Sequence, residues 1–278
     1  MRLSISNIAW STEEDSSIAE LLQSYNVDAI DIAPGKYFSD PCNTSDIEIV
    51  NVKNWWLDRG IEITGMQALL FGTTGLNMFG TPDSKSAMLK HLDAVCRIGA
   101  GLGANRLVFG SPKNRDRTGL SEKEALDIAS VFFHNLGDIA ISHGVVVCLE
   151  PNPSIYNSNF MTTSLETAEV VTLTNHPAIK MQLDTGAITL NKEDAAVIVK
   201  NWAHLIGHIH ISEPNLVPLG DGTTNHDLMR LALDTFPSRT VLTIEMLATV
   251  NEPHMLSIKR SLDLAVTKYS NSLTGLER

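Results

Sequence analysis

The sequence predicts a single eight-stranded parallel α/β barrel. Short apolar runs alternate with amphipathic, helix-like segments along the chain, and this alternation is the pattern of repeated βα units in a parallel sheet. Eight such units fit within 278 residues, about the typical length of a closed (β/α)8 barrel. Since no linker or low-complexity stretch interrupts the βα rhythm, we expect one domain over residues 1–278.

The predicted strands are short apolar runs bounded by turn residues. Such runs, rich in β-branched and bulky side chains, are typical of strands that are buried on both faces of a parallel sheet. They occupy residues 3–8, 28–33, 62–68, 105–109, 145–150, 179–184, 206–211 and 241–246.

Capping signals mark several of the intervening helices. Ser11-Thr-Glu-Glu14 and Ser121-Glu-Lys-Glu124 are capping boxes, in which the Ser oxygen and the Glu carboxylate satisfy free backbone N–H groups. Gly144 follows the end of one predicted helix, as is common for a helix C-terminus. We expect helices after residue 11 and over residues 45–59, 83–101, 121–142, 164–174, 192–202, 226–235 and 253–268, with a tail at residues 270–278.

The last four predicted strands each end in or near a metal-binding residue. These residues are Glu150, Asp184, His210 and Glu245. Strand alternation makes each of them the last residue on the inward face of its strand. Because catalytic groups of parallel barrels sit at the carboxyl ends of strands, the four side chains should meet at the barrel mouth. Three carboxylates and one imidazole suit Mn²⁺, Mg²⁺ or Co²⁺, with Zn²⁺ as an alternative.

Each of the four residues also has an ordinary structural explanation. A carboxylate at a strand end often caps a helix, and a His in an apolar strand is usually a hydrogen-bonded core residue. Four such residues on consecutive strands, all facing inward, are harder to explain in that way. His208 lies two residues deeper in its strand than His210, and we interpret it as a packed, structural residue.

Composition excludes some classes of function. The formal net charge is −11, so the basic footprint of a non-specific nucleic-acid binder is missing overall. The sequence has no run of 18 apolar residues and no recognisable signal peptide, so we expect no membrane association. Cys42, Cys96 and Cys148 show no Cys-x-x-Cys spacing and are expected to be buried free thiols of a cytoplasmic protein.

Several further residues near predicted strand ends could contact a substrate. Two cations follow the fourth strand and could clamp a phosphate or carboxylate, although a solvated loop with surface ion pairs would look the same. The residues near the other strand ends could bind hydroxyl groups or orient the metal ligands. The full set of substrate-binding candidates is Lys36, Gln67, Lys113, Arg115, Glu213 and Asn215.

At the four strand ends the chain resembles the xylose-isomerase-like TIM-barrel superfamily of sugar isomerases and epimerases. The matching segments are Leu-Glu150-Pro-Asn, Leu-Asp184-Thr-Gly, His-Ile-His210-Ile-Ser-Glu-Pro-Asn and Ile-Glu245. By resemblance to the ketose 3-epimerases, the four residues would hold one divalent ion, often Mn²⁺. Glu150 and Glu245 would also act as acid and base on a small carbohydrate through a metal-stabilised enediolate. Dimers and tetramers are common among these relatives, so the resemblance also allows a homo-oligomer.

The sequence departs from the ketose 3-epimerases at two positions. Ala187 stands where they carry a substrate-contacting His, and Leu216 stands where they carry an Arg. These differences leave other functions of the superfamily open. The main alternative is a metal-dependent lyase of the dehydroshikimate-dehydratase type; an endonuclease-IV-like repair enzyme and a non-catalytic sugar-binding barrel are weaker alternatives.

Overall fold

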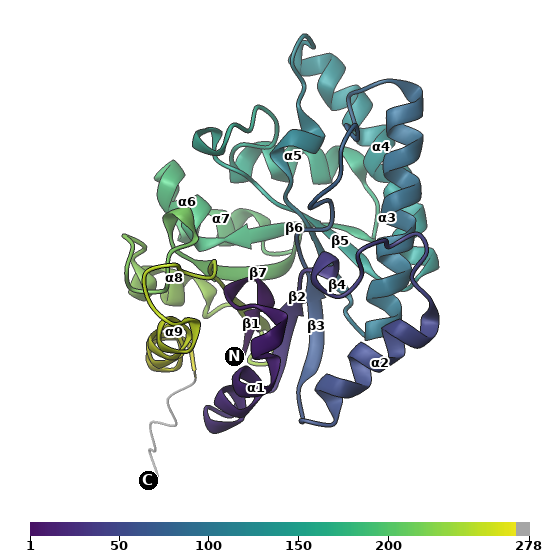
Figure 1. The fold of residues 1–278 in the computed structure, drawn as a ribbon. Helices are drawn as coiled ribbons and strands as arrows, with labels where there is room; N and C mark the ends of the chain where they lie inside the picture. Colours follow the sequence, from purple (N-terminus) through teal and green to yellow (C-terminus); the bar gives the residue numbers. More distant parts are fainter. Residues whose placement is uncertain (271–278) are drawn as a thin grey trace.

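A computed structural model describes residues 1–270 of the protein. Within this range eight parallel strands close into a barrel in chain order, and the helices surround it (Figure 1). The predicted (β/α)8 barrel is therefore confirmed. The strands are β1 (Arg2–Ser6), β2 (Ala29–Ile32), β3 (Glu62–Met66), β4 (Arg106–Phe109), β5 (Val146–Leu149), β6 (Ile179–Asp184), β7 (Ile206–Ser212) and β8 (Val241–Glu245).

The helices follow the strands as the capping signals predict. Ser121 accepts a hydrogen bond from the Glu124 N–H, and the Glu124 carboxylate accepts one from the Ser121 N–H. The helices are α1 (Asp15–Ser24), α2 (Asp46–Leu57), α3 (Pro82–Leu102), α4 (Glu122–Ser142), α5 (Ser164–Thr174), α6 (Thr185–Asn191), α7 (Ala195–Trp202), α8 (His226–Leu233) and α9 (His254–Tyr269).

One helix was not predicted. Helix α6 begins directly after β6, because Asp184 is its N-cap and accepts a hydrogen bond from the Ala187 N–H at 2.6 Å. A strand that ends in an N-capping residue can pass into a helix without a loop. The expected tail lies, from residue 271 onward, outside the described residues.

The apolar core lies between the strands and the helices, whereas the barrel interior is polar. Phe109 of β4, for example, packs edge-on against Phe133 of α4, with 5.4 Å between ring centroids. Inside the barrel, Ser4 lies beside Thr243 and Asp31 beside Gly65 in the strand register. A polar interior needs internal hydrogen bonds, because an unpaired buried polar group is costly. The polar side chains continue to the carboxyl ends of the strands, where Asp184 and Glu245 lie.

The three cysteines differ in their exposure. Cys96 and Cys148 are buried free thiols, but Cys42 is exposed, so the prediction of three buried cysteines is wrong for Cys42. Cys42 lies in the polar connection before α2, outside any apolar face. Among the described residues, no helix combines the length and apolarity that a membrane crossing requires.

Candidate metal centre

The barrel brings the four predicted metal ligands together. One ligand atom from each of Glu150, Asp184, His210 and Glu245 lies within 4.8 Å of the others. Nδ1 of His210 is 3.1 Å from a Glu245 oxygen and 3.6 Å from a Glu150 oxygen. Asp184 and Glu245 are the last residues of β6 and β8, His210 lies in β7, and Glu150 directly follows β5. Adjacent parallel strands thus deliver all four donors to one end of the barrel.

Hydrogen bonds fix the direction of Asp184. Its Oδ2 accepts a hydrogen bond from the Ser212 hydroxyl at 2.6 Å, while its Oδ1 accepts the Ala187 N–H. Ser212 is the last residue of β7 and is fully buried. Two partners on neighbouring segments leave this carboxylate little rotational freedom.

Amide side chains orient the two other carboxylates. Gln67 donates to Oε1 of Glu245 at 2.6 Å, and Asn152 donates to Oε2 of Glu150 at 3.0 Å. Sequence reasoning proposed Gln67 but missed Asn152, although the Leu-Glu-Pro-Asn motif placed it two residues after Glu150. Arg115 in turn donates to the Asn152 side chain at 2.5 Å and to the Glu150 backbone carbonyl at 2.7 Å.

The crowded charges shift the pKa values of the site. Burial, together with the charges of Glu245 and Glu150, raises the pKa of Asp184 to about 7. Burial works against a charged His210, yet the same two glutamates raise its pKa well above the ordinary value. Three carboxylates against one imidazole leave the site short of positive charge at neutral pH, and like charges this close repel strongly without a counter-ion.

The donor set fits a divalent cation. Buried carboxylates are costly unless they are paired or bind a metal, and the four ligand atoms lie within 4.8 Å of one another. The oxygen-rich set with one nitrogen suits Mn²⁺, Mg²⁺, Co²⁺ or Zn²⁺.

A cavity of about 960 Å³ opens above these ligands, and most of the proposed substrate-binding residues line it. Lys36 donates its ammonium protons to the backbone carbonyls of Asn7 and Trp10, and Lys113 donates to the Thr73 carbonyl at 3.0 Å. Ala187 and Leu216 also contribute to the lining. The candidates that line the cavity are Lys36, Gln67, Lys113, Glu213 and Asn215.

Arg115 has a different position from the one a substrate clamp requires. Its side chain is fully buried and its guanidinium binds the segment that follows β5, as described above. Burial lowers its pKa to about 10. The geometry makes Arg115 a support for Glu150 and Asn152, whereas Lys36 and Lys113 line the cavity.

Glu213 braces the loop that follows β7. It is almost fully buried, and its two oxygens accept the Gly220 N–H at 2.9 Å and the Thr224 N–H at 2.8 Å. Nε2 of His226 lies 3.0 Å from the same carboxylate. Asn215 is exposed, and its N–H donates to the Tyr156 hydroxyl at 2.7 Å, which joins this loop to the one after β5.

Replacing Glu213 with Gln should destabilise the protein at neutral pH more than at acid pH. Burial alone would raise the pKa of Glu213, but the hydrogen bonds from His226, Thr224 and Gly220 lower it to about 2. A lowered folded-state pKa stabilises the fold above the unfolded value of about 4.3 and loses that contribution as pH falls through about 2. Urea unfolding at several pH values should show a deficit in the variant that shrinks with acidification. A loss of unfolding free energy that does not change with pH would contradict this account. The control is Glu169→Gln, a substitution at an exposed position.

Replacing Gly110 with Ala should disturb Glu150 while leaving the fold intact. A Cβ at Gly110 would lie 2.0 Å from Oε2 of Glu150, so the carboxylate must move. A displacement of about 1 Å can lower turnover about 10²-fold. At Gly35, which also lines the cavity, a Cβ meets nothing within 4 Å, so Gly35→Ala is the control for an added methyl group that displaces no side chain. Equal turnover by both variants, with equal melting temperatures, would show that the position of Glu150 is unimportant.

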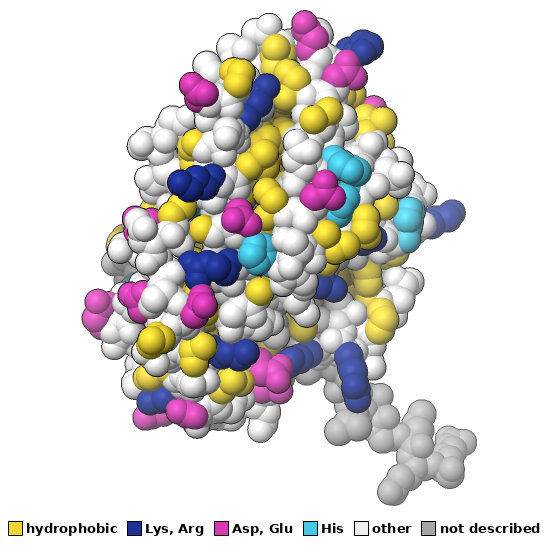
Figure 2. All heavy atoms as spheres, turned by 90° about the vertical axis from the view of Figure 1, so that its right-hand side faces the viewer, with side chains coloured by type: hydrophobic (Ala, Val, Ile, Leu, Met, Phe, Trp, Pro, Cys, Tyr) yellow, Lys and Arg dark blue, Asp and Glu magenta, His cyan; other side chains and the backbone are white. Residues whose placement is uncertain are grey.

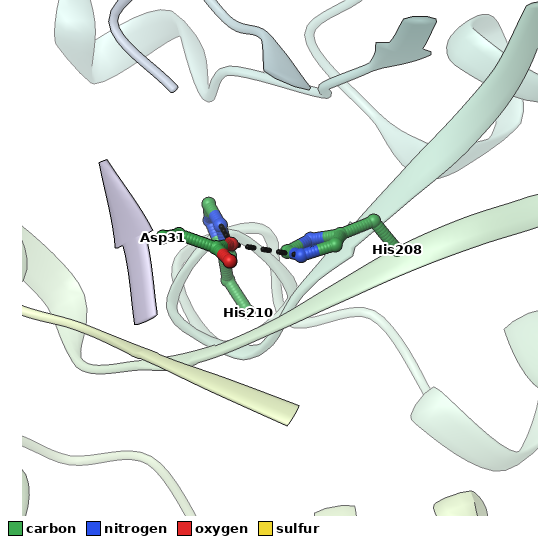
Figure 3. A group of neighbouring side chains, drawn as sticks. All are labelled: Asp31, His208 and His210. Atoms are coloured by element: carbon green, nitrogen blue, oxygen red, sulfur yellow. Dashed lines mark ion pairs between the residues drawn. The ribbon is translucent and has the colours of Figure 1, made fainter. Parts of the chain in front are cut away.

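A second buried group lies deeper in the barrel. Figure 3 shows Asp31 of β2 close to His208 and His210 of β7. The Asp31 carboxylate is 2.9 Å from Nε2 of His208 and 3.9 Å from Nε2 of His210. Burial would raise the pKa of Asp31, but His208 beside it holds that pKa below the ordinary value. His208 is thus a packed, hydrogen-bonded residue, and Asp31 is a site neighbour that sequence reasoning missed.

The outer surface carries both signs of charge. On the face in Figure 2, Lys and Arg side chains lie among Asp and Glu side chains. The surface ion pairs of residues 1–270 include Lys123 with Asp127 and Lys268 with Asp227.

Comparisons with known proteins agree on the fold. The family profile described as xylose isomerase-like TIM barrel matches residues 19–264. A D-psicose 3-epimerase from Clostridium cellulolyticum H10 is 18% identical over 97% of this chain and 100% of its own, with a TM-score of 0.80. A 3-keto-D-glucoside 4-epimerase from E. coli is 16% identical over 96% of this chain and 99% of its own, with a TM-score of 0.76. The IolI protein, solved with a zinc atom, is 16% identical over 97% of this chain and 100% of its own, with a TM-score of 0.74. No curated protein sequence matches the chain.

Proposed function

Because this chain belongs to the xylose isomerase-like TIM-barrel family, we propose that it is a divalent-metal-dependent isomerase or epimerase of a small sugar. The observation that carries the proposal is the group of four ligand atoms within 4.8 Å at the barrel mouth. Sugar epimerases among the similar structures, and the zinc atom of the IolI protein, are consistent with it.

Glu150, Asp184, His210 and Glu245 would hold the ion, which we expect to be Mn²⁺. When bound, it would polarise a carbonyl group of the sugar and stabilise the negative charge that develops during proton removal. Glu150 and Glu245 would move the proton. One carboxylate would take the hydrogen next to the carbonyl, and the other would return a proton to the opposite face or to the neighbouring carbon.

The hydrogen bonds around the two carboxylates support this division of work. Gln67 and Asn152 each hold one oxygen of a glutamate, which leaves the second oxygen of that glutamate for the ion or the substrate proton. A carboxylate that is fixed in direction can transfer a proton without first losing rotational freedom. Asp184, whose two oxygens accept hydrogen bonds from Ser212 and Ala187, is better suited to holding the ion than to proton transfer.

We propose that the substrate is a neutral sugar rather than a phosphorylated or acidic one. The fully buried Arg115 guanidinium serves the segment after β5, and the ammonium groups of Lys36 and Lys113 already donate to backbone carbonyls. A bidentate phosphate clamp normally needs a guanidinium at the cavity. Ala187 and Leu216 add apolar surface to the same lining, so the sugar should differ from those that the ketose 3-epimerases hold with His and Arg.

A substrate panel tests the proposed function. The Mn²⁺-loaded protein should be incubated with free ketoses, 3-keto sugars, ketose phosphates and 3-dehydroshikimate, and the products should be followed by NMR in D₂O. Epimerisation or isomerisation with deuterium incorporated next to the carbonyl would support the proposal. Conversion of 3-dehydroshikimate alone, which would give a new aromatic absorbance, would replace it with the lyase alternative.

A further inference from the structure

A fully buried carboxylate lies inside the barrel, one layer below the proposed metal ligands. Asp31 belongs to β2 and has no exposed surface. Its Oδ1 accepts the Thr64 hydroxyl at 3.0 Å, and its Oδ2 accepts the Thr243 hydroxyl at 3.0 Å. Burying an ionised carboxylate costs several kcal/mol, and the hydrogen-bond donors around Asp31 offset part of that cost.

The strand register places a residue without a side chain, Gly65, beside the Asp31 carboxylate. Gly65 lies beside Asp31 in the register of β2 and β3, and a Cβ there would come within 2.6 Å of the Asp31 carboxylate. Nε2 of His208 approaches Oδ2 at 2.9 Å, and the Gln182 side-chain amide lies 3.1 Å from Nδ1 of His208. Side chains of β3, β7 and β8 therefore hold Asp31 in place inside the barrel.

The two nitrogens of His210 face different groups. Nδ1 faces the carboxylates of Glu245 and Glu150, where the ion would bind. Nε2 lies 3.9 Å from Oδ2 of Asp31 and has no hydrogen-bond partner among the described residues. Figure 3 shows the two side chains close together. A buried N–H without a partner is costly, and Asp31 is the acceptor that the barrel places on that side.

From this arrangement we infer that Asp31 is a positioning residue for His210. With the ion bound, Asp31 would accept the Nε2 proton of His210, so that Nδ1 keeps a free lone pair for the ion. Metal-bound histidines usually donate their second N–H to a carboxylate or a carbonyl, which fixes the ring and makes it a better donor. The present 3.9 Å is longer than a hydrogen bond of about 2.9 Å, so ion binding should bring the His210 ring and Asp31 closer together.

The inference rests on the metal site of the proposed function. Its test therefore measures metal affinity and the hydrogen bonding of the His210 ring. The zinc dissociation constant of the wild type, Asp31→Asn and Asp15→Asn should be measured by chelator competition. Asp15 is a matched control, because it is also a buried carboxylate with two hydrogen bonds, to Trp10 and Tyr37, but does not face His210. We expect zinc binding to weaken about 10- to 100-fold in Asp31→Asn and to stay unchanged in Asp15→Asn.

Nitrogen-15 spectra of histidine-labelled, zinc-loaded protein provide a readout that a purely structural role would not move. The Nε2 proton of His210, assigned with a His210→Gln variant, should be shifted downfield and exchange slowly in the wild type. It should lose both properties in Asp31→Asn. If Asp31→Asn does not fold, a crystal structure of the zinc-loaded wild type decides: a His210 Nε2 to Asp31 distance of about 2.9 Å would support the inference.

Two outcomes would overturn the role of Asp31. One is zinc binding by a folded Asp31→Asn variant as tight as that of the wild type; the other is a loaded structure in which the separation remains near 3.9 Å. A wild type that binds no divalent ion would instead overturn the proposed function itself. The measurement thus separates failure of the metal site from failure of its positioning residue.

Discussion

Replacing Glu245 with Gln should lower turnover of the substrate by at least about 10²-fold, the usual contribution of a positioned acid or base. Gln keeps the shape of the side chain and an oxygen ligand but cannot accept a proton. Glu245 is suited to the base role because, although burial raises its pKa, the nearby His210 lowers it overall, which keeps the carboxylate ionised. Turnover should be measured at saturating metal, so that a weaker ion affinity does not mimic a lost base.

The control for this substitution is Glu169→Gln on the exposed side of α5. This variant loses one carboxylate of the same type at a distance from the barrel mouth, and its turnover should equal that of the wild type. Unchanged turnover in metal-saturated Glu245→Gln would remove Glu245 from the chemistry. In that case Glu150→Gln should be tested for the same loss.

Replacing Asp184 with Asn should abolish most of the stabilisation that the protein gains from a divalent ion. A ligand at 100 times its dissociation constant stabilises the folded state by about 2.7 kcal/mol. Loss of a carboxylate ligand should weaken binding by more than the 10- to 100-fold typical of groups outside the ligand set, and this gain then largely disappears. Thermal unfolding with and without added Mn²⁺ measures the effect directly.

Asp184 also caps α6, so the control must replace a capping carboxylate with an amide at a helix outside the site. Asp194 caps α7 and accepts the Ala196 N–H at 2.9 Å. Asp194→Asn should therefore keep the full rise in melting temperature with Mn²⁺. An Asp184→Asn variant that gains as much from Mn²⁺ as Asp194→Asn does would show that Asp184 is only a capping residue.

The sequence was sufficient to predict the barrel because its local signals agree with one another. Capping boxes at Ser11 and Ser121 and the apolar strand runs all indicate the same βα alternation, and strand alternation then brings Glu150 and Glu245 to one face. Helix α6 was missed because Asp184 acts as both strand end and N-cap. Periodicity cannot separate a strand from a helix that follows it without a turn.

The environment of the site was harder to predict than its ligands. Asp31 lies inside an apolar strand run, and its closeness to His210 depends on strand register across the barrel. Arg115 follows Lys113 by two residues, yet it is buried whereas Lys113 reaches the cavity. The conformation of the loop decides which of these two side chains is buried. A loop has no repeating sequence pattern that would predict this conformation.

The most direct test of the metal centre is the metal content of the purified, Mn²⁺-reconstituted wild type, measured by mass spectrometry after removal of unbound ions. With Glu150, Asp184, His210 and Glu245 as one ligand set, we expect about one divalent ion per chain and much less in Asp184→Asn. A reconstituted wild type that retains no divalent ion would contradict the metal site and favour a non-catalytic, sugar-binding barrel.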